Sequence, residues 1–265
     1  MNLSKLSYYT FLCVVLTGSI VLSSCKDNDS DESNNGESPL ALTITVENGN
    51  SYNSKIDSVK AEAFSENAQK TLILASTSYQ NGGFHIILPY PLDDKLLSND
   101  ILSDVPSGVV VSDHTAKATI ADFYGYKSGN RMIDADFIFG GFRHAASSNS
   151  LTVEITQASM VYCDKPVKIT GSYTEEVEDG VSAVFTMNVS WTKGWNIVYT
   201  TQKTTIDALT GKITASGNVT LTKPAYNLKW YVGDDFLESI TSELGINSIA
   251  NTVNKIKPAL FQLKK

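Results

Sequence analysis

Histidine and cysteine are scarce in this sequence, which limits the chemistry available to it. Among its 265 residues there are three histidines, His85, His114 and His144, and three cysteines, Cys13, Cys25 and Cys163. The histidines are far apart, and none lies in the His-Glu-x-x-His spacing that binds zinc on a helix. The spacing gives no support for a zinc or haem site assembled in space, and we expect no metal and no cofactor.

Recognisable catalytic motifs are also lacking. The sequence contains no Gly-x-Ser-x-Gly turn, no P-loop and no dinucleotide fingerprint. Cys163 has no partner histidine in a known motif, which is typical of a small buried side chain rather than a nucleophile. Asp134 and Asp136 lie two positions apart, as exposed residues of one strand face do, whereas a glycosidase pair normally needs a buried acid. We therefore expect no catalytic residue, and the pattern favours a protein that is not an enzyme.

Basic residues are fewer than acidic ones. The chain has 21 lysines and arginines against 28 aspartates and glutamates, which gives a net charge of −7. Nucleic-acid phosphates require clustered basic residues. The balance of charges therefore argues against nucleic acid as a partner.

The N-terminus has the pattern of an export signal. Lys5 precedes a nearly unbroken apolar run from Tyr8 to Leu22, which is too short to cross a hydrocarbon core of about 30 Å comfortably. The run ends in Leu-Ser-Ser-Cys25, which resembles the lipobox of bacterial prolipoproteins. The resemblance implies a signal peptide at residues 1–24 and acylation of Cys25, and two or more acyl chains such as palmitate hold a protein firmly to a membrane. The alternative is a signal peptide without lipidation.

A polar, acidic tract follows Cys25. Its first part, KDNDSDE at residues 26–32, resembles the acidic export tag of surface-exposed lipoproteins of the Bacteroidetes, which implies an outer-membrane protein that faces the medium. The tract also lacks the apolar area that would offset the entropy of ordering. We therefore expect a disordered tether at residues 25–40, and the two interpretations are compatible.

Short alternating runs of β-branched and aromatic residues follow the tether, separated by Gly, Asn, Asp and Ser. Long amphipathic helices are missing between them. This pattern predicts an all-β fold built from antiparallel β-sandwich domains. The expected strands are 41–47, 56–64, 71–76, 84–88, 116–124, 131–139, 151–157, 167–173, 181–191, 195–201, 212–221 and 226–232.

The segment Gly140–Asn149 is small, polar and glycine-bearing, and we place a domain boundary in it. The result is an N-terminal sandwich at 41–145 and a C-terminal β domain at 146–265, while the alternative is one continuous sandwich. GGFHIILP, residues 82–89, resembles transthyretin-like or carboxypeptidase-regulatory modules, which implies a non-catalytic first sandwich. VYCDKPVKITG and KGWNIVY resemble segments of secreted Bacteroidetes β-proteins of unassigned function.

Helical signals are confined to the C-terminus. Asp235 and Glu238 have the spacing of a capping box, and the apolar stripe after them ends at Gly245. A further apolar stripe continues to Pro258, so that one or two short helices are expected, followed by a last strand at 259–263.

The stretch VSWTKGWNIVY, residues 189–199, predicts a hairpin whose three-residue loop ends at Gly194. This register places Trp195 directly across from Trp191. One interpretation is an aromatic platform that binds sugar rings, with Trp230 as a third candidate ligand-binding residue. The other is a cross-strand pair in the core, which is favoured because both tryptophans are in phase with apolar neighbours.

A modification site is also indicated. Asp57-Ser58-Val59 resembles the short acceptor motif for O-glycosylation in Bacteroidetes periplasmic and surface proteins, which makes Ser58 a candidate acceptor.

Together these features predict a lipid-anchored all-β protein at the cell surface. The leading hypothesis is a non-catalytic binding protein that captures a glycan or another nutrient for an outer-membrane partner protein. It depends on the anchor, the tether and the sandwich rather than on an identified pocket. The alternatives are an adhesion or surface-assembly protein that uses its sheet edges, and a hydrolase with a site dispersed over loops.

Overall fold

Strands make up most of the described chain, which confirms the all-β prediction. The computed structural model describes residues 37–65, 70–178, 181–207 and 209–244. Cys25, the signal peptide, the second C-terminal helix and the last expected strand lie outside these ranges. The strands are β1 (Leu40–Thr45), β2 (Ser58–Ser65), β3 (Lys70–Ser78), β4 (Gly83–Leu88), β5 (Val109–Val111), β6 (Ala118–Lys127), β7 (Asn130–Ala146), β8 (Ser150–Cys163), β9 (Val167–Glu178), β10 (Val181–Trp191), β11 (Gly194–Asp207), β12 (Ile213–Thr220) and β13 (Lys229–Val232). The helical segments are η1 (Gly49–Tyr52), η2 (Asp94–Leu96), α1 (Asp100–Ser103) and α2 (Asp235–Leu244).

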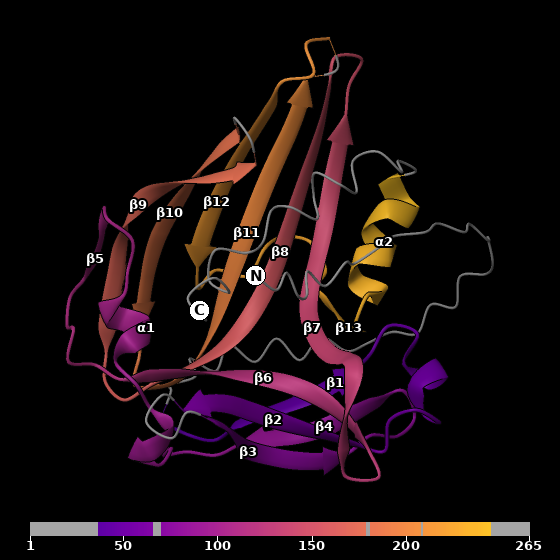
Figure 1. Ribbon diagram of the computed structural model, residues 1–265, viewed down its shortest axis with the longest axis vertical. Helices are drawn as coiled ribbons and strands as arrows, with labels where there is room; N and C mark the ends of the chain where they lie inside the picture. Colours follow the sequence, from indigo (N-terminus) through magenta and orange to yellow (C-terminus); the bar gives the residue numbers. More distant parts are fainter. Residues whose placement is uncertain (1–36, 66–69, 179–180, 208, 245–265) are drawn as a thin grey trace, which may run out of the picture.

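The described strands form two sheets (Figure 1). The larger sheet has the order β3-β2-β6-β7-β8-β11-β12-β10-β9-β5, with β13 paired to β7. The smaller sheet is the antiparallel pair of β1 and β4. Strands β10 and β12 run parallel to each other, and the other strand pairs are antiparallel as expected.

Strand β7 links the lower and upper parts of the larger sheet. Its first half pairs with β6, where Phe137 lies opposite Phe123, and its second half pairs with β8 from Phe139 to Ala146. Figure 1 shows β7 bending where the two halves meet. Strand β6 crosses below the second half of β7 and strands β8, β11 and β12, which we call the tall strands. The boundary expected between 41–145 and 146–265 falls at the tip of the β7–β8 hairpin, and the sheet is continuous across it. The division into two domains stays a prediction.

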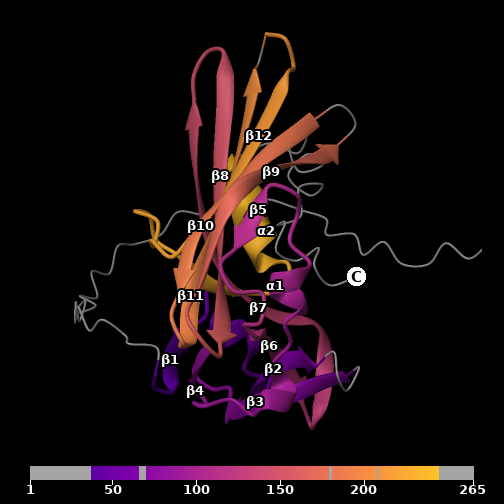
Figure 2. The same ribbon diagram turned by 90° about the vertical axis from the view of Figure 1, so that its left-hand side faces the viewer.

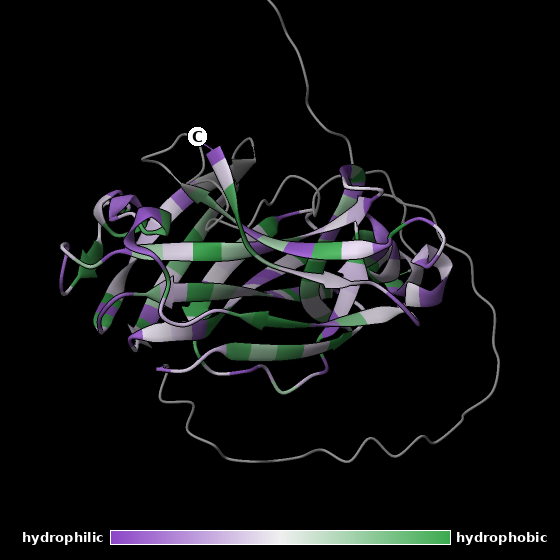
Figure 3. Cartoon of the chain, turned by 90° about the horizontal axis from the view of Figure 1, so that it is seen from below, coloured by the Kyte–Doolittle hydropathy of each residue, from purple (hydrophilic) through white to green (hydrophobic). Residues whose placement is uncertain are grey.

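The lower part of the molecule is a two-layer sandwich. Strands β1 and β4 pack on β3, β2, β6 and the first half of β7, below the tall strands (Figure 2). The ring of Phe84 lies 5.0 Å from that of Phe137, and Trp230 meets Phe123 edge-on at 5.4 Å, a favourable arrangement for aromatic pairs. Figure 3 shows the alternation of hydrophobic and hydrophilic residues along the strands that builds this lower core.

A separate upper core lies on the other face of β8. Val161 and Cys163 point into it, whereas Met160 and Tyr162 belong to the lower core. Residues of α1 and β5 close the upper core. The end of β8 is therefore buried on both faces and ties the two cores together.

Helix α2 packs on the tall strands beside β13. Phe236 and Ile240 contact Phe142 of β7 and Ile155 of β8. The ring of Phe236 lies over Gly140, where a Cβ atom would come within 2.8 Å of it. Glycine at this position therefore allows the helix to lie close to β7.

The prediction that β10 and β11 form a hairpin is wrong, because the two strands do not pair with each other. Strand β12 lies between them, antiparallel to β11 and parallel to β10. After Trp191 the chain turns, and β11 starts at Gly194 opposite Cys163 of β8. Trp191 consequently lies in the upper core and Trp195 in the lower core. The local pattern suits a hairpin, but β10 pairs with β9 and β11 pairs with β8 instead.

The side chain of Asn196 holds the turn between β10 and β11. Asn196 is only 7% exposed. Its Oδ1 accepts a hydrogen bond from the backbone N–H of Thr192 at 2.9 Å, and its Nδ2 donates to the carbonyl oxygens of Thr192 and Gly194 at 2.9 and 3.0 Å. One buried amide thus satisfies three backbone groups of the turn.

Several carboxylates lie close together where β13 leads into α2, around Asp234. Gly233 approaches Asp134 so closely that a Cβ atom would lie 2.3 Å from the Asp134 carbonyl oxygen. The Oδ1 atom of Asp234 is buried with no hydrogen-bond partner among the described residues. Burial raises the pKa of Asp234 to about 6, and the negative charges of Asp134, Asp136 and Glu238 act in the same direction.

Asp235 itself lies in the first turn of α2 rather than before it. Its carboxylate accepts a hydrogen bond of 2.8 Å from the hydroxyl of Tyr52. The helix predicted to start here is present, and Asp235 connects it to the segment that precedes β2.

Asn196→Ala is expected to lower the free energy of unfolding by about 1–3 kcal/mol, because it leaves backbone groups of the turn without partners. Chemical denaturation of the purified full chain measures the change. Asn188→Ala is the matched control, since Asn188 is exposed on β10 and its removal should cost less than about 0.5 kcal/mol. Equal losses in the two variants would contradict the role given to Asn196.

Asp234→Asn is expected to raise the thermal midpoint at pH 7. Because the folded-state pKa is raised from 3.8 to about 6, the folded chain binds this proton more tightly than the unfolded chain. The stabilisation from the protonated carboxyl is complete below pH 3.8 and is lost as the pH rises through about 6. The advantage of the asparagine should therefore shrink when melting is repeated at pH 4.

Asp57→Asn serves as a control of opposite sign, because a hydrogen bond from the backbone N–H of Ser128 lowers the pKa of Asp57. This variant should melt at a lower temperature than the native chain at pH 7. If the difference in thermal midpoint between Asp234→Asn and the native chain is the same at pH 4 and pH 7, the raised pKa of this carboxyl is refuted.

Candidate functional site

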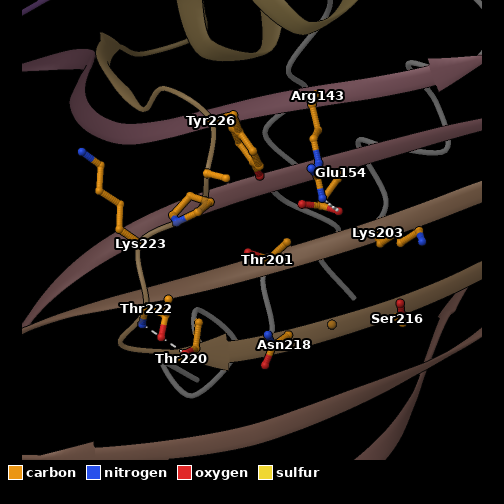
Figure 4. Close-up of a pocket in the computed structure, with 13 residues that line it drawn as sticks. Arg143, Glu154, Thr201, Lys203, Ser216, Asn218, Thr220, Thr222, Lys223 and Tyr226 are labelled. Atoms are coloured by element: carbon orange, nitrogen blue, oxygen red, sulfur yellow. Dashed lines mark hydrogen bonds and ion pairs between the residues drawn. The ribbon is translucent and has the colours of Figure 1, made fainter.

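A groove lies on one face of β7, β8, β11 and β12 (Figure 4). Its volume is about 540 Å³, within the range of about 300–1,000 Å³ that is usual for small-molecule sites. The residues that line the groove are Arg143, Glu154, Thr201, Lys203, Ser216, Gly217, Asn218, Thr220, Thr222, Lys223, Pro224, Ala225 and Tyr226. Hydroxyl, amide and charged groups predominate among them.

One wall of the groove is the chain between β12 and β13, residues 221–228, which we call the crossover. Strand β12 pairs with β11, and β13 pairs with β7, so the crossover passes over β11, β8 and β7. Gly141 allows it to lie close to the sheet, because a Cβ atom there would be 2.5 Å from the carbonyl oxygen of Asn227. The crossover brings Tyr226 over the strands.

The strand register arranges the floor of the groove in two rows that each cross four strands. Arg143, Glu154, Lys203 and Ser216 lie opposite one another in the charged row. Gly141, Thr156, Thr201 and Asn218 form the adjacent neutral row. Since neighbouring strands are about 4.8 Å apart, each row is about 14 Å long between its end strands.

In the charged row, Arg143 is held by Glu154. The Nη2 atom of Arg143 donates a hydrogen bond of 2.9 Å to Oε2 of Glu154, which raises the pKa of the guanidinium. The guanidinium also lies over the ring of Tyr226, 5.4 Å from its centroid. The Glu154 side chain is 16% exposed and that of Arg143 is 60% exposed. The ion pair adds little stability at such exposure, and it orients the arginine.

Hydroxyl groups connect the neutral row to the crossover. The Oγ1 atoms of Thr156 and Thr201 are hydrogen-bonded at 2.6 Å, and Thr156 also shares a short hydrogen bond with the hydroxyl of Tyr226. Burial raises the pKa of Tyr226, so its phenol is neutral at ordinary pH. These contacts fix the tyrosine against the strands.

Four polar side chains of the groove remain open to solvent. Lys203, Ser216, Asn218 and Lys223 are exposed, and none of them has a hydrogen-bond or ion-pair partner within the described part of the chain. Figure 4 shows Lys223 at one end of the groove and Lys203 toward the other. Donors and acceptors for a ligand are thus present along the whole groove.

The lining provides groups for hydrogen bonding and for charge. Its one carboxylate, Glu154, is hydrogen-bonded to Arg143, whereas glycoside hydrolysis normally uses two carboxyl groups on either side of the scissile bond. The lining residues include neither histidine nor cysteine. The groove offers hydrogen bonds, charge and one aromatic ring.

The tryptophans proposed for an aromatic platform are all buried. Trp191, Trp195 and Trp230 are 4%, 5% and 8% exposed. Trp195 donates a 2.9 Å hydrogen bond from Nε1 to the carbonyl oxygen of Pro89, and Trp230 stacks on Phe139 at 5.0 Å. The three rings therefore belong to the cores and form no exposed surface for a sugar, but Trp191 and Trp195 lie in different cores and do not make the expected cross-strand pair.

The other candidate positions lie away from the groove. Ser58 is half-buried at the start of β2, and its hydroxyl donates to the carboxylate of Asp57 at 3.0 Å. Burial raises the pKa of Cys163 to about 11, which favours an unreactive thiol. Within the described ranges, no three His, Cys, Asp or Glu side chains are grouped to hold a metal ion.

Sequence reasoning missed the groove. Ser216, Asn218 and Thr220 alternate with buried residues of β12, which is typical of any solvent-facing strand. The one signal that could have indicated it is the pair Gly140 and Gly141 inside a strand, because glycine there marks a close approach of another segment.

Comparisons with known proteins provide no relative from which a function can be transferred. No described helix is long and apolar enough to cross a membrane. No protein-family model, no curated protein and no solved structure matches the chain. Function is therefore inferred from the N-terminal sequence features and from the groove.

Proposed function

We propose that this protein is a lipid-anchored cell-surface protein that binds a glycan without modifying it, and that the groove is the ligand site. The observation on which this depends is a preformed groove of about 540 Å³ lined by hydroxyl, amide and charged side chains with one tyrosine ring. A saccharide presents many hydroxyl donors and acceptors, and a site for it needs matching polar groups in fixed positions.

The floor of the groove supplies such fixed positions. Thr156, Thr201 and Tyr226 are hydrogen-bonded to one another, and Arg143 is oriented by Glu154. Side chains that are already ordered lose little conformational entropy when a ligand binds. A polar ligand can therefore bind here with useful affinity although the groove has little apolar surface.

The sequence supports the location in this proposal. The lipobox-like segment and the acidic tract would attach the fold to the outer membrane through Cys25 and hold it away from the lipid on a polar tether. A groove held at the cell surface would meet glycans of the medium and pass them to an outer-membrane partner protein.

A second candidate function, surface assembly, is favoured by the ends of the larger sheet. Strands β3 and β5 each have one edge that pairs with no other described strand of that sheet. Ile73 of β3 and Val110 of β5 are 56% and 64% exposed. Open edges with exposed apolar side chains can pair with another chain.

Cys25→Ala is expected to move the protein from the membrane fraction to the soluble fraction, because the acyl chains that would hold it are missing. Fractionation of cells that produce the full chain, followed by immunodetection, measures the change. Cys13→Ala is the matched control and should leave the protein in the membrane, since residue 13 lies in the predicted signal peptide. A Cys25→Ala protein that stays tightly bound to membranes would refute lipidation.

Ser216→Trp is expected to weaken saccharide binding by about tenfold or more, because the indole would occupy the charged row beside the crossover. The full chain purified in detergent is tested by calorimetry against a panel of neutral and acidic polysaccharides. Ser190→Trp adds the same ring to an exposed position of β10 outside the groove and should bind as the native chain does.

Unchanged circular dichroism and melting in both tryptophan variants show that a loss of binding comes from occlusion. If the native chain binds no polysaccharide of the panel, or if Ser216→Trp binds as well as native, the proposed function is wrong. Stable oligomers of a chain that binds no saccharide would instead support surface assembly.

A further inference from the structure

The groove has a positive charge although the chain as a whole is acidic. Arg143, Lys203 and Lys223 line it together with a single carboxylate, Glu154, whereas the whole sequence has a net charge of −7. Three cations against one anion leave an excess of two positive charges. This local excess needs an explanation, because uncharged donors would suffice for a neutral sugar.

The ion pair within the charged row leaves Lys203 available to bind a ligand. Lys203 lies opposite Glu154 in the register, yet the ion pair of Glu154 is made with Arg143 at 2.9 Å. One guanidinium N–H is used in that hydrogen bond, and an arginine has five donors. The remaining donors of Arg143 and the ammonium of Lys203 therefore both belong to the charged row, two strands apart.

We propose that the ligand of the groove is an anionic saccharide, one whose sugar units bear carboxylate or sulfate groups, with an acidic group bound over the charged row between Arg143 and Lys203. The inference rests on the proposed function and names its ligand class. The neutral row, with Thr201 and Asn218, meets the sugar hydroxyls. Lys223, at the far end of the groove, meets a second acidic group of the same chain.

Both cation types suit such a ligand. A guanidinium oriented by a carboxylate can form paired hydrogen bonds to carboxylate or sulfate oxygens, while a lysine ammonium attracts any nearby anion. Contacts of this kind to an exposed groove weaken as salt is added, because ions screen charges over about 8 Å at physiological ionic strength. Affinity for the anionic ligand should therefore depend on salt, and affinity for a neutral sugar should not.

The test compares matched polysaccharides on the full chain purified in detergent. Polygalacturonate is paired with its neutral methyl ester, and dextran sulfate is paired with dextran. At low salt the native chain should bind the anionic member of at least one pair about tenfold more tightly than its neutral partner. The pair with the larger difference identifies carboxylate or sulfate as the preferred group, and added sodium chloride should reduce that difference.

The variant that tests the cations is Lys203→Gln combined with Lys223→Gln. It should remove the preference, because its affinity for the anionic polysaccharide should fall to about that for the neutral partner. The control combines Lys70→Gln with Lys168→Gln, which removes the same charge from exposed positions on β3 and β9. The control should retain the preference.

The outcomes separate this inference from the proposed function. Equal affinity for the neutral and anionic members of both pairs, or an equal loss in the control variant, would overturn the anionic ligand and leave saccharide binding in place. Absence of binding to all four polysaccharides would overturn the proposed function itself. Binding of single-stranded oligothymidylate as tightly as the anionic polysaccharide would show that charge alone is recognised, and it too would overturn the inference.

Discussion

The close contacts at Gly140 and Gly141 of β7 are the constraint on which the groove depends. On one face of the strand the ring of Phe236 would lie 2.8 Å from a Cβ atom at Gly140, and on the other the carbonyl oxygen of Asn227 would lie 2.5 Å from one at Gly141. A side chain at either position would push α2 or the crossover away from the sheet. Two adjacent glycines therefore allow the crossover and α2 to pack closely on opposite faces of β7.

The floor of the groove is held in place by strands that continue into the two cores. Strand β8 is buried on both faces at Met160 and Val161, where the lower and upper cores meet, and the same strand supplies Glu154 and Thr156 to the groove floor. Side chains on long paired strands are held more precisely than side chains on loops. The single irregular wall, the crossover, is fixed by the hydrogen bond between Tyr226 and Thr156.

Local patterns in the sequence were sufficient for the strands and insufficient for their order. Each of the twelve strands expected within the described ranges is present, because alternation is a property of a few consecutive residues. The short β5 was missed beside a patternless loop. The hairpin joining Trp191 to Trp195 failed because β12, from later in the chain, separates its two strands. The charged row could not be predicted for the same reason. Arg143 and Lys203 lie in one row only because β7 and β11 both pair with β8.

The net charge of the chain, likewise, does not show how the charged side chains are distributed over the fold. Strand β7 has Asp134 and Asp136 in its lower half, beside the carboxylate of Asp234, and Arg143 in its upper half, beside Lys203 across β8. Because salt screens these charges over about 8 Å, each end acts on its own surroundings rather than on the molecule as a whole. An acidic chain can therefore have one basic groove, and the lower end of β7 repels the same anions that the upper end attracts. The excess of acidic residues argues against wrapping a nucleic acid, and it leaves an anionic saccharide as a suitable ligand for the groove.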